Sequence, residues 1–262
     1  MYDFSVQKEM FGVARSILQS IDVNNYALGG GTTLSACYWN HRNSTDIDIF
    51  LFEKDAHLKK IRDSLGKSHI VQLLKKIGYQ GSFKYPGNYL EIEIDTYKKI
   101  QFFESKHYRP NAYTFHRLWG YNTNIESVDE IIYKKIFYRA EKCNARDIFD
   151  IALAIHKDPS ILQTIVTIKS SFVNNLMVLE EALYAMTKNE EALLVYKAEI
   201  DYISPSLEFM LIAYHAPRYL CDYLEAFLIA FKQGALSNDF LVALEKEVYG
   251  NVVIPFPTNP VG

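Results

Sequence analysis

The chain has 262 residues, of which 49% are hydrophobic and 23% are charged, so it is long enough to fold around one large core or two smaller ones. Its 28 Lys and Arg residues against 31 Asp and Glu residues give a formal net charge of −3, which excludes an overall positive field that would attract nucleic acid. The three cysteines, Cys37, Cys143 and Cys221, lie far apart in the sequence. Their spacing fits neither a disulfide framework nor a zinc site and predicts reduced thiols.

Two stretches bear on the location of the protein. The N-terminus, MYDFSVQKEMF, lacks the basic and then apolar pattern of a signal peptide. The most apolar run, Leu207–Phe231, is interrupted by charged residues and by Pro217, so it predicts buried helices instead of a membrane span. We therefore expect a cytoplasmic protein without membrane contact.

The N-terminal part of the chain leads into a glycine-rich turn. Apolar residues at helical spacing predict a helix over Ser5–Ile21, and a short apolar strand follows at Tyr26–Leu28. Because the glycines of Gly29–Gly31 lack a Cβ atom, the backbone there can turn sharply and approach a ligand closely. Thr32 and Thr33 follow where a helix should begin, and the N–H groups and hydroxyls at such a position suit phosphate oxygens.

A second strand alternates acidic and apolar residues in Asp46-Ile47-Asp48-Ile49. Side chains two residues apart on a strand share a face, so both carboxylates point one way while the isoleucines point into a core. A phosphate-binding turn followed by two convergent carboxylates is the arrangement that a Mg²⁺-bound nucleotide requires. For the two acids alone, a solvated sheet edge and a glycosyltransferase metal site remain alternatives.

Between this strand and residue 127 we expect one helix and then mainly strands. Asp55–Gly78 is amphipathic with helical spacing and stops at a glycine. Strands are predicted at Tyr79–Tyr85, Tyr89–Thr96, Ile100–Glu104 and Ala112–Leu118. In the second of these, Glu91, Glu93 and Asp95 alternate with apolar residues and form an acidic face.

From Val128 onward the apolar spacing is helical. Helices are predicted at Asp129–Glu141, Ala145–Ile155, Pro159–Phe172, Asn175–Thr187, Glu190–Tyr202, Ser206–Ala216, Arg218–Gly234 and Asn238–Tyr249. The proline-rich end, Val252–Gly262, predicts an extended tail. The change of period predicts two domains, an α/β domain over residues 1–127 and a helical domain over residues 128–262.

The ordered motifs resemble those of a known family. Gly30-Gly31-Thr32-x-Leu34 followed by His41-Arg42-x-Ser44-x-Asp46-Ile47-Asp48-Ile49-Phe50 resembles the AbiEii/AbiGii toxin branch of the nucleotidyltransferase superfamily with the DNA polymerase β-like fold. The resemblance implies a mixed β-sheet core of the α/β class followed by an all-helical C-terminal domain. It also implies a third metal-binding carboxylate on a strand beside the Asp-x-Asp strand. Glu93 or Asp95 fits that role, and we prefer Glu93; the alternative is that these acids only keep an exposed edge soluble.

A second group of motifs lies at the start of the helical half. The family has a Lys on one helix and Arg-Asp-x-x-Asp at the start of the next, which Lys135 and Arg146-Asp147-x-x-Asp150 resemble, with Lys134 as the fallback for Lys135. A Lys at this position can neutralise triphosphate charge. The chain departs from the family at Thr33 and Tyr138, where Ala is usual.

The resemblance implies transfer of a nucleoside monophosphate from an NTP to an acceptor hydroxyl. Asp46 and Asp48 would hold one or two Mg²⁺ ions with Glu93, and Glu93 or Asp95 would activate the attacking oxygen. The nucleotide would contact residues of both motif groups, namely Gly30, Gly31, Thr32, Thr33, Arg42, Arg146 and Asp147, with Lys135 stabilising charge on the phosphates.

The biological role implied by the resemblance is that of the toxin in a type IV toxin–antitoxin pair, with an antitoxin partner and RNA such as tRNA as an acceptor. Protein and small-molecule acceptors remain open, the latter as in aminoglycoside nucleotidyltransferases. A catalytically silent module that binds a nucleotide or a partner is the alternative from another class. The basic cluster Lys134, Lys135, Arg139, Lys142 and Arg146 is where RNA would bind.

Overall fold

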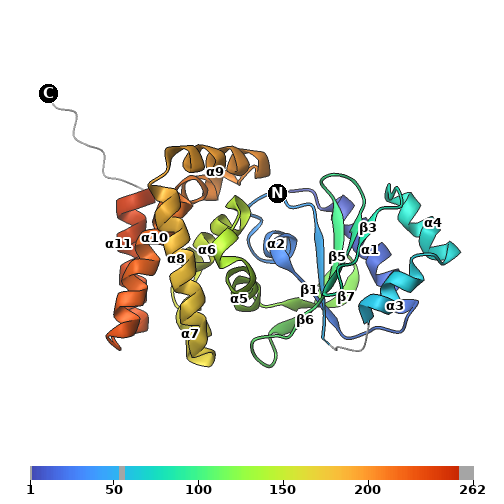
Figure 1. Ribbon diagram of the computed structural model, residues 1–262, viewed down its shortest axis with the longest axis horizontal. Helices are drawn as coiled ribbons and strands as arrows, with labels where there is room; N and C mark the ends of the chain where they lie inside the picture. Colours follow the sequence, from blue (N-terminus) through green and yellow to red (C-terminus); the bar gives the residue numbers. More distant parts are fainter. Residues whose placement is uncertain (1, 53–56, 254–262) are drawn as a thin grey trace. The chain divides into compact units, whose positions relative to one another are not determined.

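The computed structural model describes residues 2–52 and 57–253 of the chain (Figure 1). It contains two compact units, Met1–Glu130 and Ile131–Gly262, which divide inside helix α5 (Val128–Arg139). The domain boundary predicted after residue 127 remains a prediction. Part of the predicted extended tail, residues 254–262, lies outside the described residues, and so does Asp55 at the predicted start of the second helix.

The first unit is built on a seven-stranded mixed sheet with the order β3-β4-β5-β2-β1-β7-β6. The strands are β1 (Tyr26–Gly29), β2 (Ile47–Leu51), β3 (Phe83–Lys84), β4 (Tyr89–Glu93), β5 (Lys99–Glu104), β6 (Tyr113–Leu118) and β7 (Tyr121–Glu126). Strand β2 pairs antiparallel with β1 and parallel with β5, while β1 pairs parallel with β7. The mixed sheet confirms the predicted fold class for this half of the chain.

One face of this sheet carries the core of the first unit. The alternation in β2 places Ile47, Ile49 and Leu51 on that face, where all three are buried. They pack in one cluster with apolar residues of α1 (Ser5–Gln19), α3 (His57–Ser64) and α4 (Ser68–Lys76). Figure 1 shows these helices on the same side of the sheet. Asp48, the acidic residue of β2, therefore belongs to the opposite face.

Four predictions for this unit are corrected by the structure. The single helix predicted over Asp55–Gly78 is two helices, α3 and α4, separated by a turn around Gly66. The strand predicted over Tyr79–Tyr85 is reduced to β3. No strand was predicted at β7, which pairs with both β1 and β6. Strand β4 does not lie beside β2, because β5 lies between them.

The glycine-rich turn continues directly into a short helix. Helix α2 (Gly30–Thr33) follows β1 and runs into a wider π-helical segment, η1 (Leu34–Trp39). Asn40 ends this segment in the left-handed conformation, with φ of 49°. Segments of π-helix occur frequently at functional sites.

The second unit is all-helical, which confirms the predicted class of this half. After α5 its helices are η2 (Ala140–Lys142), α6 (Ala145–Lys157), α7 (Ile161–Ile168), η3 (Ser170–Phe172), α8 (Val173–Thr187), α9 (Glu190–Ile203), η4 (Leu207–Phe209), α10 (Met210–Lys232), α11 (Asn238–Val248) and η5 (Tyr249–Val253). None of the described helices in either unit has the length and apolar character that a membrane span requires.

Helix α10 is one continuous helix, so the break predicted at Pro217 is wrong. Proline has no backbone N–H, and the carbonyl of Ala213, four residues earlier, therefore lacks its usual helical donor. The hydroxyl of Tyr196 on α9 donates a hydrogen bond to this carbonyl at 2.5 Å, and Tyr196 is buried. A side chain from a neighbouring helix thus replaces the bond that proline removes, and the helix tolerates Pro217.

We predict that Tyr196→Phe destabilises the protein by about 1–3 kcal/mol, because it leaves the buried Ala213 carbonyl without a donor. Pro217→Ala supplies a backbone N–H to the same carbonyl, so it should recover part of this loss in the Tyr196→Phe background. Urea unfolding of wild type, both single variants and the double variant measures the coupling. If the stability changes of the two single variants sum to that of the double variant within about 0.5 kcal/mol, the Tyr196 hydroxyl does not replace the backbone N–H that Pro217 lacks.

Candidate active site

A row of polar residues crosses the sheet on the face opposite the core. Asp48 pairs with Gly29 of β1 on one side and with Gln101 of β5 on the other, and Gln101 pairs in turn with Glu91 of β4. Leu28 pairs with Ile125, so the next residues, Gly29 and Glu126, are also neighbours. Laterally paired residues share a face of a sheet. Carboxylates of three strands therefore lie in one row that has Gly29 and Gln101 between them.

Two of the three glycines of the turn, Gly29 and Gly30, leave space for two of these carboxylates. Gly30 has a φ of +71°, and a Cβ atom at this residue would lie 1.8 Å from Oδ2 of Asp48. A Cβ atom at Gly29 would lie 2.2 Å from Oε2 of Glu126 and 2.5 Å from a ring carbon of Phe50. The glycines therefore permit a close approach of Asp48 and Glu126 to the backbone from two sides. From the sequence, this space was expected to serve a phosphate.

The Thr32 hydroxyl holds the backbone next to the site in place. It donates to the carbonyl oxygen of Asp46 at 2.5 Å and lies 2.8 Å from Oγ of Ser44. Thr32 and Thr33 are both buried. Gly30 and Gly31 are half-buried at the start of the helix, where backbone N–H groups have no intrahelical acceptor. Their N–H groups are the donors that an anion can use at this turn.

Arg42 braces the loop that leads to Asp46. Its side chain is buried and Nη1 donates to the carbonyl oxygen of Asn43 at 3.0 Å. The backbone carbonyl of Arg42 accepts a hydrogen bond from Oγ of Ser35 at 2.6 Å. His41 beside it is fully buried. The predicted contact between Arg42 and phosphate remains a prediction.

The acids Glu93 and Asp95 lie apart from the row of Asp48. Glu93 accepts hydrogen bonds from Nζ of Lys84 at 2.5 Å and from Ser82, and the Lys84 bond is the main cause of a Glu93 pKa lowered to about 2. Asp95 follows the end of β4 and forms an ion pair with Lys98 at 2.8 Å. Their predicted metal and base roles remain predictions.

Glu91 is the acid of β4 that belongs to the row. It is buried and accepts a hydrogen bond from Nε2 of Gln101 at 2.6 Å, while Lys84 and Lys99 each lie 3.2 Å from its Oε1. Glu91 was not predicted as a site residue, because the alternation along β4 does not reveal its pairing register with β5 and β2. The register with Asp48 distinguishes it from Glu93.

A second cluster with metal-ligating side chains surrounds Glu126. Donor atoms of His107, Glu126 and Glu130 all lie within 4.8 Å of one another, and Nε2 of His107 is 3.5 Å from Oε1 of Glu126. Both glutamates are fully buried, and the His107 ring packs edge-on against Phe52. Imidazole and carboxylate donors together can hold a divalent transition metal. None of these three residues was selected from the sequence, and Glu126 lies on β7, which was not predicted.

In the second unit, Lys135 is enclosed by the acids of the Arg-Asp-x-x-Asp motif. Its Nζ lies 2.5 Å from Oδ1 of Asp147 and 3.1 Å from Oδ2 of Asp150, and all three side chains are buried. Arg139 adds a contact of 3.1 Å to Asp147. Burial alone would raise the pKa of Asp147, but the two cations outweigh it and hold this pKa below its ordinary value. The N-cap of α6 is Asn144, which accepts from the Asp147 N–H, and Arg146 is exposed.

The match to a family model agrees with the motifs. A family model described as "Nucleotidyl transferase AbiEii toxin, Type IV TA system" matches residues 13–175. The chain is also similar to the crystal structure of JHP933 from Helicobacter pylori, with 13% identity over 94% of this chain and 100% of that chain and a TM-score of 0.49. The solution structure of the antibiotic-resistance factor ANT(2'')-Ia has 14% identity over 68% of this chain and 97% of that chain, with a TM-score of 0.47. No curated protein matches the chain.

We predict that Gly30→Ala destabilises the first unit by about 1–3 kcal/mol, because a Cβ atom here meets both a left-handed backbone and the Asp48 carboxylate. Gly66→Ala is the matched control, since a Cβ atom at Gly66 meets nothing within 4 Å. Chemical unfolding of both variants measures the difference. Equal effects of the two substitutions would show that the close approach of Asp48 is unimportant for stability.

A further prediction concerns Lys135→Met, which leaves two buried carboxylates without this cation. We expect a loss of about 3–5 kcal/mol at neutral pH, whereas Lys142→Met at an exposed position should change stability by less than about 0.5 kcal/mol. In wild type the lowered pKa of Asp147 contributes stability above its unfolded pKa, and this is lost as pH falls through the folded pKa.

Without Lys135, burial becomes the dominant influence on Asp147 and raises its folded pKa. Protonation of Asp147 at acidic pH then removes the buried charge that destabilises the variant. The stability difference between wild type and Lys135→Met should therefore shrink when urea unfolding is repeated near pH 4.5. A difference that is small at neutral pH, or that does not depend on pH, would contradict a structural role for this ion cluster.

Proposed function

We propose a reaction for this chain on the premise that it belongs to the AbiEii nucleotidyl transferase toxin family. Family membership supports transferase activity in general. The specific proposal is that an acceptor hydroxyl attacks the α-phosphorus of an NTP. The new bond joins the acceptor oxygen to this phosphorus, the bond from the α-phosphorus to the bridging oxygen breaks, and pyrophosphate leaves. The proton of the acceptor passes to a base or to water.

The observation that carries the proposal is the close approach of the Asp48 carboxylate to Gly30 at the start of a helix. This brings a carboxylate next to backbone N–H groups that can bind phosphate. Asp46 immediately precedes β2 and Asp48 is its second residue, and both are half-buried. This fits Mg²⁺, which takes carboxylate oxygens together with substrate phosphates and water. When bound, the ion would neutralise phosphate charge.

The chain's own groups have the following roles in this proposal. The N–H groups of Gly30 and Gly31 bind phosphate oxygens, and the hydroxyl of Thr32 fixes the backbone of Asp46. Arg42 holds the preceding loop in place. Orientation by such fixed groups, and not covalent chemistry, is the main contribution that a protein makes to phosphoryl transfer.

The pairing register of the strands favours a different third carboxylate from the one predicted from the sequence. The register supports Glu91 or Glu126, which share a row with Asp48, over Glu93 and Asp95. The low pKa of Glu93, held down by Lys84, also makes it a weak base at neutral pH. Substitution of each acid by its amide, with transfer as the readout, would separate these candidates.

Lys135 has a positioning role in the proposal. Its ammonium group is held by Asp147 and Asp150, so it fixes these two acids in place before any phosphate is bound. Arg146 is exposed and remains the proposed cation of this motif for a direct phosphate contact. The acids and Lys135 then act as one unit, and their substitutions should affect transfer together.

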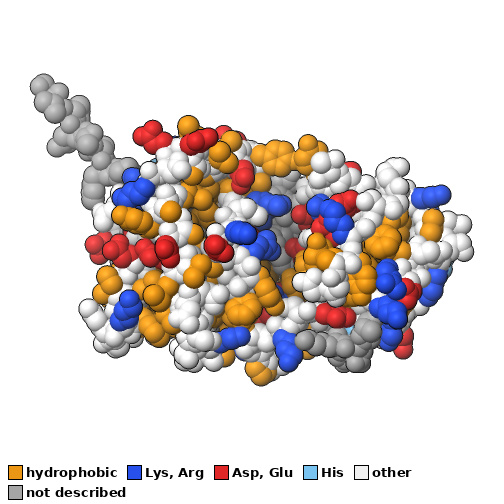
Figure 2. All heavy atoms as spheres, viewed as in Figure 1, with side chains coloured by type: hydrophobic (Ala, Val, Ile, Leu, Met, Phe, Trp, Pro, Cys, Tyr) orange, Lys and Arg blue, Asp and Glu red, His pale blue; other side chains and the backbone are white. Residues whose placement is uncertain are grey.

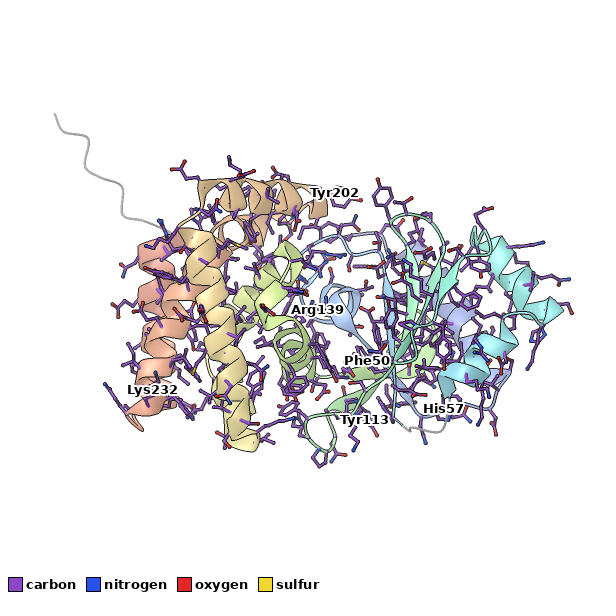
Figure 3. The ribbon with its side chains drawn as sticks, viewed as in Figure 1. Phe50, His57, Tyr113, Arg139, Tyr202 and Lys232 are labelled. Atoms are coloured by element: carbon purple, nitrogen blue, oxygen red, sulfur yellow. The ribbon has the colours of Figure 1, made fainter. Side chains whose placement is uncertain are left out.

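RNA is the acceptor that we propose, with an antitoxin as the functional partner of the chain. Support comes from the exposed side chains of Lys142 and Arg146 and from Arg139, whose side chain is 52% exposed. Figure 3 labels Arg139 among the side chains of its helix. A phosphate backbone attracts exposed cations of this kind, although Arg139 also pairs with Asp147, whereas Lys135 is buried between carboxylates.

We predict that NTPs labelled at the α-phosphate transfer label to RNA when the protein is incubated with Mg²⁺ and separated fractions of RNA, protein and small molecules. Asp48→Asn should reduce transfer on the order of 100-fold while the fold is retained, because it removes charge from the proposed metal site. Asp63→Asn is the control, since Asp63 is exposed on α3, where it pairs with its neighbour Arg62.

Three outcomes separate the alternatives. Label in the protein or small-molecule fraction would replace RNA as the acceptor and keep the reaction. NTP binding without label in any fraction would favour the silent module. Transfer that is unchanged by Asp48→Asn would overturn the proposed site itself.

A further inference from the structure

Helices α8 and α10 of the second unit pack against each other (Figure 1), and side chains of both line a groove. Its volume is about 500 Å³. The residues that line it come from one face of each helix and are Met177, Glu180, Glu181, Tyr184, Glu225, Leu228, Ile229 and Lys232. Lys232, labelled in Figure 3, is at the C-terminal end of α10. We call this the α8–α10 groove.

The α8–α10 groove exposes apolar side chains at helical spacing. Met177 and Tyr184 are two turns apart on α8 and are 43% and 55% exposed, and Ile229 on α10 is 50% exposed. Leu228 beside it is buried and forms part of the floor. Apolar groups spaced by two turns match the contact face of an amphipathic helix, which repeats with the same period.

The same groove concentrates negative charge. Three of its lining residues, Glu180, Glu181 and Glu225, are acidic, and Lys232 is its single lining cation among the described residues. Burial is the main cause of a raised pKa at Glu180, and repulsion from Glu225 and Glu181 adds to it. The glutamates are therefore close enough to destabilise each other's charged forms.

Two further cations, Lys188 and Arg218, lie near the groove residues. Lys188 lies over the ring of Tyr184 at 5.0 Å, and with Arg218 it acts on Asp222, whose pKa is nevertheless raised by burial and by Glu225. Figure 2 shows acidic side chains in a band, with hydrophobic side chains beside it, over the part of the surface that α8, α10 and α11 form. A cationic occupant would relieve the repulsion among the glutamates.

We propose that the α8–α10 groove binds a basic amphipathic helix of a partner protein. The apolar side of that helix would pack on Met177, Tyr184 and Ile229, while its Lys or Arg residues pair with the glutamates. RNA and anionic membranes carry negative charge and are repelled by the same glutamates. The proposal does not depend on nucleotidyl transfer, because none of its residues belongs to the candidate active site.

The test uses a fluorescent synthetic peptide of about 18 residues with Leu at helical spacing and Lys at the other positions. We expect saturable binding to the full chain, measured by fluorescence anisotropy. Glu181→Lys with Glu225→Lys should weaken this binding at least about tenfold. Glu190→Lys with Glu208→Lys, an equal charge change at exposed positions outside the groove, should change it less than about twofold.

A second pair of variants separates apolar contact from charge attraction. Ile229→Ser should weaken binding about threefold or more, whereas Ile168→Ser on α7, at a position that is also 50% exposed, should leave it unchanged. Absence of saturable binding would overturn the proposal. So would equal binding of a peptide with Glu in place of Lys, or equal effects of the groove and control variants. The Glu181→Lys, Glu225→Lys protein should still transfer label from the NTP. Measuring this transfer separates a loss of peptide binding from a failure of the proposed reaction.

Discussion

The first unit depends on one close approach, between the carboxylate of Asp48 and the backbone of Gly30. Antiparallel pairing of β1 with β2 brings the two residues together, and the left-handed φ of Gly30 turns the chain from strand into helix at the same point. The Thr32 hydroxyl then fixes the carbonyl of Asp46, and Arg42 holds the loop between. A side chain at residue 30 would disturb all of these contacts at once. The position of the carboxylate is therefore set by the backbone, before any ligand is bound.

Buried charge is the second constraint, and it is met differently in the two units. In the second unit Lys135 and Arg139 neutralise Asp147, so the Arg-Asp-x-x-Asp motif forms a buried ion cluster. In the first unit Glu126 and Glu130 lie near His107, next to the glycine turn. Burial of an ion pair seldom adds stability over an apolar replacement. Removal of one partner, however, leaves a buried charge uncompensated, so the residues of such a cluster depend on one another.

The sequence predicted those features that rest on strong local patterns. The alternation in Asp46-Ile47-Asp48-Ile49 predicted β2 and its two faces, and helical spacing after Val128 predicted an all-helical half. The order of strands was not predictable, because the insertion of β5 between β2 and β4 depends on tertiary pairing. Strand β7 was missed since its sequence, YNTNIE, has a single strongly apolar residue, Ile125. The break expected at Pro217 was wrong because the hydroxyl of Tyr196 donates to the Ala213 carbonyl in place of the N–H that proline lacks. Tyr196 lies on another helix, so no local sequence pattern predicts this contact.

The central claim is that Asp46 and Asp48 bind a divalent metal together with a nucleotide at the glycine turn. Electron paramagnetic resonance of Mn²⁺, used in place of Mg²⁺, measures this directly in the presence of a non-hydrolysable NTP analogue. We predict that the wild-type protein removes the signal of free Mn²⁺ and that the Asp46→Asn, Asp48→Asn double variant does not, although it remains folded. Equal binding of Mn²⁺ and nucleotide by the two proteins would contradict the account.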